Sequence, residues 1–447
     1  MGTFIIDKQT FNDLNIFSED VSSNSILNLF KYTRTLGGRK RLIEMMNNPL
    51  NNLCEISSRR DSISFFFDNK INFDIKNEEI DLIDFYLESK FKHFKNNPLD
   101  ALSDYLTRNS SNHYYIIRTG LRYLIQTTKY ILDFIKDQKA NNPSKYLLQI
   151  FDEILDIIDG GVLMKASHLN EKRLSFFVVT NLDRAIRGAE KHNIKKFLQL
   201  MYELDVFENV ALVAASKGFS FPIFNNDEDL KINITGLFHP SIKNPVRNDL
   251  HLDVTKNIIF LTGSNMAGKS SLLKSLGLTI YLSHLGFPVP AETMKLSVFN
   301  GMATTINLPD NINEGLSHYY TEVKRVKEVA EILLRNQNIF VIFDELFRGT
   351  NVKDAYDASY LIISELSAIR NSAFIISTHI IELAASLNKF KNISFGYLDT
   401  YFENQKPVFT YSLKEGISNE TLGMYIVKNE GIVEVLKMAA KKSLCKS

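Results

Sequence analysis

The sequence predicts two parts: an all-helical first part, residues 1–230, and an α/β second part, residues 231–447, with a mostly parallel sheet covered by helices. Two observations predict this division. Before residue 230, apolar residues recur every three or four positions, which is the period of an amphipathic helix. After it, short apolar runs alternate with helical stretches, which is typical of strands in a parallel sheet. The polar segment NNDEDL, residues 225–230, marks the boundary.

Three long helices are expected in the first part. One carries an apolar stripe at alternating three- and four-residue spacing, formed by Ile117, Leu121, Leu124, Thr128, Ile131 and Ile135. A second covers residues 141–161, with Pro143 near its start and Gly160 and Gly161 at its end. A third is expected from about Glu171 to Leu204. Such stripes usually form the seam of a helical bundle, so we assign them no other role.

The second part is expected to contain four buried strands, with the sequences NIIFLT, IFVIFDE, AFIISTH and ISFGYL. Helical stretches of ordinary length separate the first three, as parallel strands require. A further run, PVFTYSL at residues 407–413, is expected to add an antiparallel strand.

Composition restricts the class of protein. The chain is 45% hydrophobic and 23% charged, so it can build ordinary cores, and its net charge of +1 argues against a uniformly basic nucleic-acid binder. The two cysteines, Cys54 and Cys445, show no disulfide or metal spacing, and the nine histidines are scattered. No signal segment or long apolar run is evident, so we expect a soluble, cytoplasmic protein with no membrane partner.

One short segment carries a specific chemical signal. Residues 263–270, GSNMAGKS, fit the pattern G-x-x-x-x-G-K-[ST]. Its glycines let successive backbone N–H groups point at phosphate oxygens, and the following helix N-terminus favours negative charge. Lys269 is expected to reach the β- and γ-phosphates and Ser270 to bind Mg²⁺. Because an apolar strand precedes the loop and a helical pattern follows, the sequence predicts a nucleotide site.

Two other strand ends support this site. Asp344 and Glu345 end an apolar strand about 75 residues after the loop, where Asp344 can hold Mg²⁺ and Glu345 can act as general base. Thr378 and His379 end another, and a histidine there can sense the γ-phosphate. Taken alone, His379 would more often be a structural histidine.

Four segments, LTGSNMAGKSS, GLSHYYTEV, VIFDELFRGTN and STHIIEL, resemble in this order the ATPase domain of the MutS DNA mismatch-repair family. Residues 239–252 and 415–432 are similar to the segments that flank it in the family, and residues 16–69 and 204–222 to the start and end of the family's helical core and lever. The resemblance implies a helical core/lever region followed by an ABC-like P-loop ATPase domain that uses ATP and Mg²⁺.

The resemblance also implies a composite ATP site shared by two subunits. The residues that would hold the nucleotide are Gly263, Ser264, Asn265, Met266, Ala267, Gly268, Lys269, Ser270 and Ser271. By the same resemblance, Ser270 and Asp344 would bind Mg²⁺, and Glu345 would activate water. His379 would follow the γ-phosphate beside Asn265.

Three further residues would act at the subunit interface. By the resemblance, Ser317 would reach the ATP of the partner, Glu322 would help to position it, and Asn351 would lie at the dimer seam. We therefore expect a homodimer that pairs through its ATPase domains.

The chain departs from the family pattern at several positions. Ala267 replaces a glycine, Ser264 a proline, and bulky Phe347 a glycine beside the catalytic strand. Val246 matches a family aromatic that stacks on adenine, and valine cannot stack, so the preference for ATP over GTP is open. We expect a short member without the N-terminal mismatch-recognition and connector domains, and we interpret Phe17-Ser18-Glu19 as a chance match to the family's mismatch-reading motif.

Two functions remain open. The first is a MutS-like ATPase in DNA repair or recombination, whose ATP binding and hydrolysis drive lever movement and DNA association. The alternative is a nucleotide-gated module that binds a protein partner, such as a repair protein, and does not bind DNA; the near-neutral charge favours it. A transporter-type or chromosome-maintenance ATPase and a P-loop kinase fit less well.

Overall fold

The computed structural model describes residues 3–17, 25–91, 112–225, 229–263, 267–306, 318–403, 406–418 and 431–444. The chain forms two compact units, each a mixture of distant segments. We call residues 18–221 and 285–288 the helical unit, and residues 1–17, 222–284 and 289–447 the sheet unit. This division falls close to the polar segment at residues 225–230, but the first 17 residues pack with the sheet unit although they precede the helical one.

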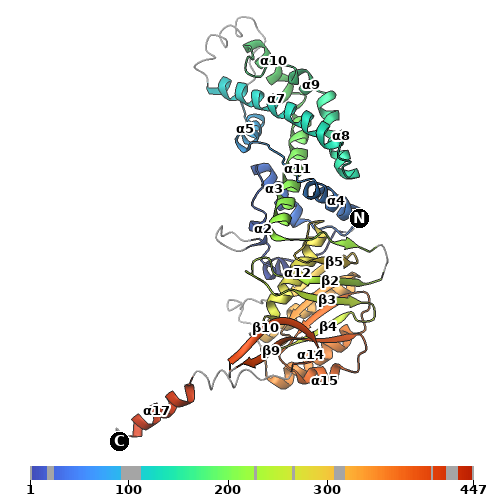
Figure 1. The fold of residues 1–447 in the computed structure, drawn as a ribbon, viewed down its shortest axis with the longest axis vertical. Helices are drawn as coiled ribbons and strands as arrows, with labels where there is room; N and C mark the ends of the chain where they lie inside the picture. The colour runs from blue at the N-terminus through green and yellow to red at the C-terminus, as the bar shows by residue number, and fades with distance from the viewer. Residues whose placement is uncertain are drawn as a thin grey trace. The chain divides into compact units, whose positions relative to one another are not determined.

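The helical unit is built from α-helices (Figure 1). They are α2 (Ile26–Leu29), α3 (Leu36–Asn47), α4 (Leu53–Asp68), α5 (Asn77–Glu88), α7 (Asn112–Lys139), α8 (Lys145–Asp159), α9 (Val162–Ser167), α10 (Phe176–Arg187) and α11 (Lys191–Lys217). Helices α7 and α8 confirm the first two predicted helices, and their apolar stripes are buried.

The third predicted helix, from Glu171 to Leu204, is wrong in its bounds because the chain forms two helices there. Ser175 caps the start of α10, and its hydroxyl accepts a hydrogen bond from the backbone N–H of Val178. Gly188 ends α10 with φ −94° and ψ −108°, which is not helical. Helix α11 then continues to Lys217 and ends at Gly218, whose φ of +66° suits glycine. The apolar period continued across the break and therefore concealed it.

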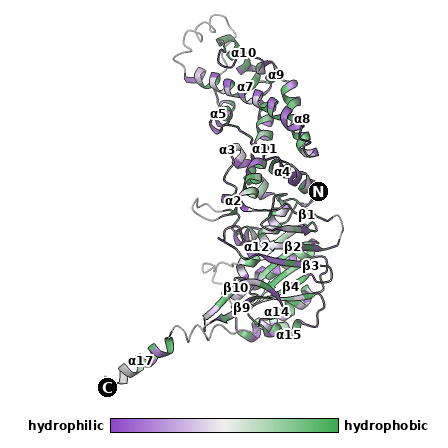
Figure 2. Ribbon diagram, viewed as in Figure 1, coloured by the Kyte–Doolittle hydropathy of each residue, from purple (hydrophilic) through white to green (hydrophobic). Residues whose placement is uncertain are grey.

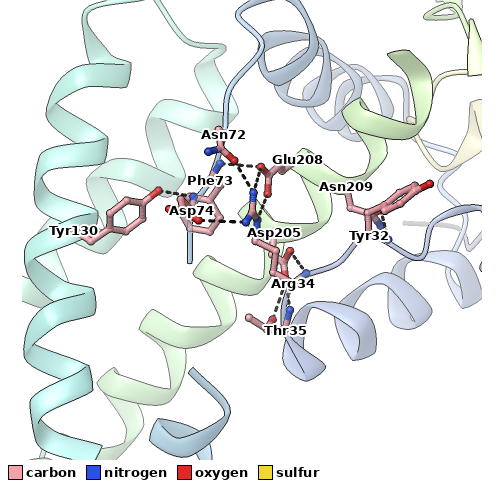
Figure 3. A network of polar contacts seen from close by, with 10 residues as sticks. All are labelled: Tyr32, Arg34, Thr35, Asn72, Phe73, Asp74, Tyr130, Asp205, Glu208 and Asn209. Atoms are coloured by element: carbon pink, nitrogen blue, oxygen red, sulfur yellow. Dashed lines mark hydrogen bonds and ion pairs between the residues drawn. The ribbon is translucent and has the colours of Figure 1, made fainter. Parts of the chain in front are cut away.

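A buried polar network fixes α11 to other parts of the helical unit (Figure 3). The Glu208 carboxylate accepts from Arg34 Nε at 2.8 Å and from its second guanidinium nitrogen at 2.9 Å. One turn earlier, Asp205 accepts from the backbone N–H groups of Arg34 and Thr35 and from the Thr35 hydroxyl. Burial raises the pKa of Asp205, and these hydrogen bonds oppose that rise. The network joins residues that lie more than 170 positions apart in sequence.

The sheet unit contains two sheets (Figure 1). The strands are β1 (Ile223–Phe224), β2 (Lys231–Leu237), β3 (Asn248–Asp253), β4 (Ile258–Thr262), β5 (Thr293–Leu296), β6 (Gly301–Thr305), β7 (Ile339–Asp344), β8 (Ala373–Ser377), β9 (Ile393–Glu403) and β10 (Lys406–Glu415). The six-stranded sheet has the order β10-β9-β4-β8-β7-β6 and the four-stranded sheet the order β1-β5-β2-β3.

The six-stranded sheet confirms the predicted mostly parallel arrangement. Strands β9, β4, β8, β7 and β6 pair in parallel, and β10 joins β9 antiparallel as expected. Strands β4 and β8 are buried along their whole length, and Figure 2 shows hydrophobic colour in the sheet around β4. The four-stranded sheet was not predicted, because continuous apolar runs were assigned as strands, whereas β2 alternates exposed polar and buried apolar residues.

The helices of the sheet unit are α1 (Lys8–Asp13), α12 (Lys269–His284), α13 (His318–Arg335), α14 (Val352–Leu366), α15 (Glu382–Leu387) and α17 (Ile432–Leu444). The segment before α1 pairs with the edge strand β6: Ile5 donates to Asn300 O and accepts from Met302 N–H. Asp13 accepts from the Thr304 hydroxyl at 2.7 Å. No helix among the described residues is long and apolar enough to cross a membrane.

Candidate functional site

The predicted phosphate loop begins at the carboxyl end of β4, in the middle of the six-stranded sheet. Gly263 has φ +137° and Gly268 has φ +95°, conformations that favour glycine. Between them, Ser264, Asn265 and Met266 lie outside the described residues, and Ala267 is fully buried. Helix α12 starts immediately afterwards at Lys269, so its N-terminus lies at the end of the loop.

The Lys269 ammonium lies inside the loop. Its Nζ donates to the Gly263 carbonyl at 2.6 Å, and the residue is 3% exposed. Burial lowers the pKa of Lys269, while the charges of Glu345 and Asp344 act in the opposite direction. The lysine is thus a desolvated cation close to two carboxylates, in the position from which a phosphate would attract it.

Ser270 and Asp344 meet although they come from different elements. Asp344 ends β7, and its Oδ2 accepts a hydrogen bond of 2.6 Å from the Ser270 hydroxyl. Its other oxygen accepts from the Ser377 hydroxyl at the end of β8, and the parallel register places Asp344 opposite Ser377. The aspartate is therefore held by both neighbours at the carboxyl edge of the sheet, where open α/β sheets bind ligands.

Glu345 follows in an unusual backbone conformation, with φ +54°. Its N–H donates to Ser377 O at 3.0 Å, and its side chain is 16% exposed. Arg348, three residues later, approaches its carboxylate to 3.5 Å. The turn is also tied to α13, because Gly349 N–H donates to Glu322 at 3.3 Å. Burial raises the pKa of Glu322, although the Gly349 hydrogen bond opposes that shift.

The remaining predicted residues lie at different places. His379 is exposed just beyond β8, after Thr378, whose N–H donates to Leu261 O. Asn351 caps α14, since its Oδ1 accepts from Asp354 N–H at 2.9 Å. Ser317 lies outside the described residues. The structure thus groups Gly263, Lys269, Ser270, Asp344 and Glu345, and it shows a helix-capping role for Asn351.

A pocket of about 410 Å³ adjoins the loop, and Gly268 and Ser271 form part of its wall. Val246 lines it and is 42% exposed. His239 also lines it, and burial, aided by the charge of Lys274, lowers the pKa of His239, which favours the neutral ring at pH 7.

Sequence reasoning missed Tyr411, one of the aromatic residues that line this pocket. It comes from β10 and lines the same pocket as Val246, although the two residues lie far apart in the sequence. Its ring lies against the loop: a Cβ added to Gly268 would meet Tyr411 Cδ1 at 2.9 Å. Ser377 was also missed as a partner of Asp344. Strand register could have indicated Ser377, but PVFTYSL gave no sign that Tyr411 faces the loop.

Comparison with protein families identifies both parts of the chain. A model of MutS domain III matches residues 9–216, and a model of MutS domain V matches residues 259–445. The chain belongs to the MutS family. The domain V match includes every described residue grouped around Asp344, and the domain III match covers most of the helical unit.

Curated MutS relatives show similar levels of identity. The DNA mismatch repair protein MutS of Thermotoga sp. (strain RQ2) is 26% identical over 69% of this chain and 39% of that protein. That of Pseudothermotoga lettingae is 28% identical over 56% of the chain and 32% of its own length. The DNA mismatch repair protein MSH3 of Candida glabrata is 27% identical over 54% of the chain and 24% of that protein. The chain therefore spans well under half of these relatives.

Proposed function

We propose that the sheet unit is a P-loop domain that binds and hydrolyses ATP. The observation that carries this proposal is the 2.6 Å hydrogen bond between Ser270 and Asp344. It joins the last residue of the phosphate-loop pattern to a strand-end carboxylate, as nucleotide-bound metal requires. A chance glycine-rich turn would have no reason to meet an acidic strand end from elsewhere in the sheet.

The donor set fits Mg²⁺. Ser270 and Asp344 offer a hydroxyl and a carboxylate oxygen, and Mg²⁺ usually takes one or two such ligands and completes its shell with phosphates and water. Among the described residues there is no cluster of three or more His, Cys, Asp or Glu side chains for a metal, which agrees with a site completed by nucleotide. When bound, the ion would neutralise charge on the phosphate oxygens.

The chain's own residues would each have a separate role in the reaction. Lys269 would exchange the Gly263 carbonyl for the β- and γ-phosphates, because a phosphate compensates a buried ammonium better than a neutral carbonyl does. Glu345 would accept a proton from the attacking water. Arg348 approaches its carboxylate to 3.5 Å, so this side chain would have to move aside where the water binds. His379, exposed beside this edge, would contact the γ-phosphate.

The nucleotide base would occupy the 410 Å³ pocket beside the loop. Tyr411 would supply the aromatic surface that Val246 cannot, because its ring already lies against Gly268. The neutral His239 would offer a hydrogen-bonding edge.

We propose that two chains pair through their ATPase domains, with Ser317 and Asn351 at the seam. The support is the match to MutS domain V together with the resemblance, which implies that such residues lie at an ATP site shared by two subunits. Asn351 would keep its capping role at the start of α14. Its exposed position there would also leave it available to a second chain.

ATP binding would move the helical unit through α12. This helix begins at Lys269 and ends at His284, and the next four residues pack within the helical unit. There Leu285 O accepts from Arg59 at 3.0 Å, and the Phe287 and Phe30 rings lie 5.5 Å apart. The helix that starts at the phosphates therefore continues directly into a segment anchored in the other unit.

The moved unit would act on DNA in repair or recombination. The MutS relatives are named as DNA mismatch repair proteins, and this is the support for DNA. The alternative, a nucleotide-gated module that binds a protein partner instead, draws on the net charge of +1. Steep salt dependence of DNA affinity would favour the first, since phosphate contacts release counterions.

The test is ATP turnover by the purified chain with no DNA, homoduplex, mismatched duplex and a branched junction, each at two salt concentrations. Glu345→Gln removes the general base and should abolish turnover under all conditions. Glu331→Gln, an exposed glutamate on α13 that pairs with Arg335, is the matched control and should not change it. Turnover that responds to one DNA supports the DNA-coupled function; turnover that ignores every DNA supports the protein-binding alternative. Full turnover by Glu345→Gln would refute the proposed chemistry.

A further inference from the structure

Strand β10 contains an irregularity where it passes the pocket. Phe409 pairs with Thr400 and Leu413 pairs with Leu398, so four steps along β10 face two steps along β9. Tyr411 lies in the middle of this bulge with φ +56°, a conformation that a bulky side chain rarely adopts. A bulge re-aims a side chain, but it also leaves backbone groups without partners in the ladder. Something must hold the strand in this shape.

Asn248, the first residue of β3, satisfies both sides of the bulge. Its Nδ2 donates to the Tyr411 carbonyl at 3.0 Å, and its Oδ1 accepts from the Leu413 N–H at 2.7 Å. The side chain is buried, with 8% exposure. A carboxamide carries a donor and an acceptor on one planar group, whereas an ionised carboxylate only accepts and an alkyl group does neither, so neither Asp nor Leu could make both contacts.

We propose that Asn248 is a positioning residue for nucleotide binding: its carboxamide clamps the β10 bulge and thereby holds the Tyr411 ring against the base pocket. One face of the pocket places the ring against the phosphate loop, since Tyr411 Cδ1 lies 2.9 Å from where a Cβ of Gly268 would be. Asn248 then acts on the base through Tyr411. The two residues are far apart in sequence, and both belong to the wall of the pocket.

This inference rests on the proposed function and makes a separate claim about it. Loss of the clamp should weaken binding of a nucleotide with a base and leave binding of the phosphates unchanged. ATP and inorganic tripolyphosphate distinguish the two, because tripolyphosphate has no base to stack. Asn248→Ala and Tyr411→Ala should each weaken ATP binding about tenfold, the usual size of one base–aromatic stack. Tripolyphosphate affinity should stay the same.

The decisive variant is the double substitution. If Asn248 acts through Tyr411, Asn248→Ala together with Tyr411→Ala should bind ATP no more weakly than Tyr411→Ala does. Additive losses would show that Asn248 contacts the base itself and would overturn the proposal. Asn233→Ala, an exposed asparagine on the neighbouring strand β2, is the matched control and should bind ATP like the wild type. Tyr411→Phe, which keeps the ring, should also do so.

A fluorescent reporter distinguishes loss of the clamp from a general loss of folding. The chain has no Trp, so Tyr411→Trp introduces a single tryptophan at the pocket. ATP should quench its emission, and tripolyphosphate should not. With Asn248→Ala added, saturating ATP should no longer quench it; an unchanged quench would overturn the clamp. If the wild-type chain bound neither ATP nor tripolyphosphate, the proposed function itself would fall.

Discussion

The Ser270 hydroxyl and the Asp344 carboxylate are hydrogen-bonded at 2.6 Å, although 74 residues separate them. They meet because β4 and β7 flank β8 in parallel, so the loop after β4 and the end of β7 lie at the same edge of the sheet. The contact positions a carboxylate where phosphate-bound metal would be held, and this gives the first prediction.

Asp344→Asn should separate metal binding from nucleotide binding. The amide keeps an oxygen that can accept from Ser270, but it loses the charge that attracts Mg²⁺. Mg²⁺-dependent turnover should fall by about 100-fold or more, in line with the loss of one electrostatic contact in a catalytic site. ATP affinity measured in EDTA should change little. Asp357→Asn, an exposed aspartate on α14, should affect neither quantity.

At Phe347, substitution by glycine should be less destabilising than substitution by alanine, which is the reverse of the usual order. It is 3% exposed, its ring centre lies 5.8 Å from that of Tyr319, and its φ is +60°. Phe347→Ala should lower the free energy of unfolding by about 3–4 kcal/mol through lost packing. Phe347→Gly loses the same ring but relieves the positive φ, so it should be about 1 kcal/mol less destabilising than alanine.

Urea denaturation of both variants checks this, with Phe343 as the control. Phe343 is buried in β7, and its φ is not positive. There, glycine should be more destabilising than alanine, as in any ordinary strand. The same order at both positions would mean that the backbone at Phe347 is not strained. It would also mean that the glycine of the MutS motif is not favoured there by conformation.

The predicted part of the site follows from one rule about parallel sheets. Once the loop that carries Lys269 and Ser270 is assigned after one parallel strand and Asp344 to the end of another, their grouping is expected, because those strand ends share an edge. Tyr411 and Asn248 could not be predicted in this way. Tyr411 faces the loop because of a bulge, and a two-residue irregularity leaves no mark on the apolar period of β10.

The fold shows the same limit. Strands β4, β7 and β8 were predictable because each is a continuous apolar run that is buried on both faces. Strand β6 was missed, although it is fully buried, because its sequence GMATT is small and polar. The pairing of Ile5 with Gly301 joins segments nearly 300 residues apart, and no local pattern indicates such a contact.

The N-terminal segment should make the stability of the sheet unit depend on pH through Asp7. Burial by itself would raise the pKa of Asp7, but the hydrogen bond and charge of Arg325, with help from Thr10, outweigh it, and the net pKa is lowered. The Arg325 guanidinium donates to Asp7 at 2.6 Å. A lowered pKa means that the ion pair stabilises the fold above the unfolded-state value near 4, and that this contribution is lost as pH falls through the lower folded-state value.

Asp7→Asn should therefore destabilise the chain by about 2 kcal/mol at pH 7. The difference from the wild type should shrink as the pH falls below about 4, since the wild-type carboxylate becomes protonated too. Thermal unfolding across this range measures it. Asp61→Asn, whose aspartate pairs with Arg60 and is half exposed, should show little difference at either pH. A gap for Asp7→Asn that persisted at pH 2.5 would contradict the ion-pair explanation.

The buried pair of Arg34 and Glu208 should matter far more than a surface pair in the same unit. The Glu208 side chain is 2% exposed and also accepts from Phe73 N–H, so its removal leaves a guanidinium and a backbone donor without their carboxylate. Because Arg34 is 30% exposed, water relieves part of this cost, and Glu208→Ala should lower the free energy of unfolding by about 3 kcal/mol. Glu153→Ala breaks the pair with Lys196, in which both side chains are at least 40% exposed, and should cost at most about 1 kcal/mol.

Urea denaturation of both variants compares their free energies of unfolding directly. Arg34→Ala combined with Glu208→Ala should cost less than the sum of the single changes. Equal losses for Glu208→Ala and Glu153→Ala would mean that the network in Figure 3 holds α11 no more firmly than a surface ion pair does.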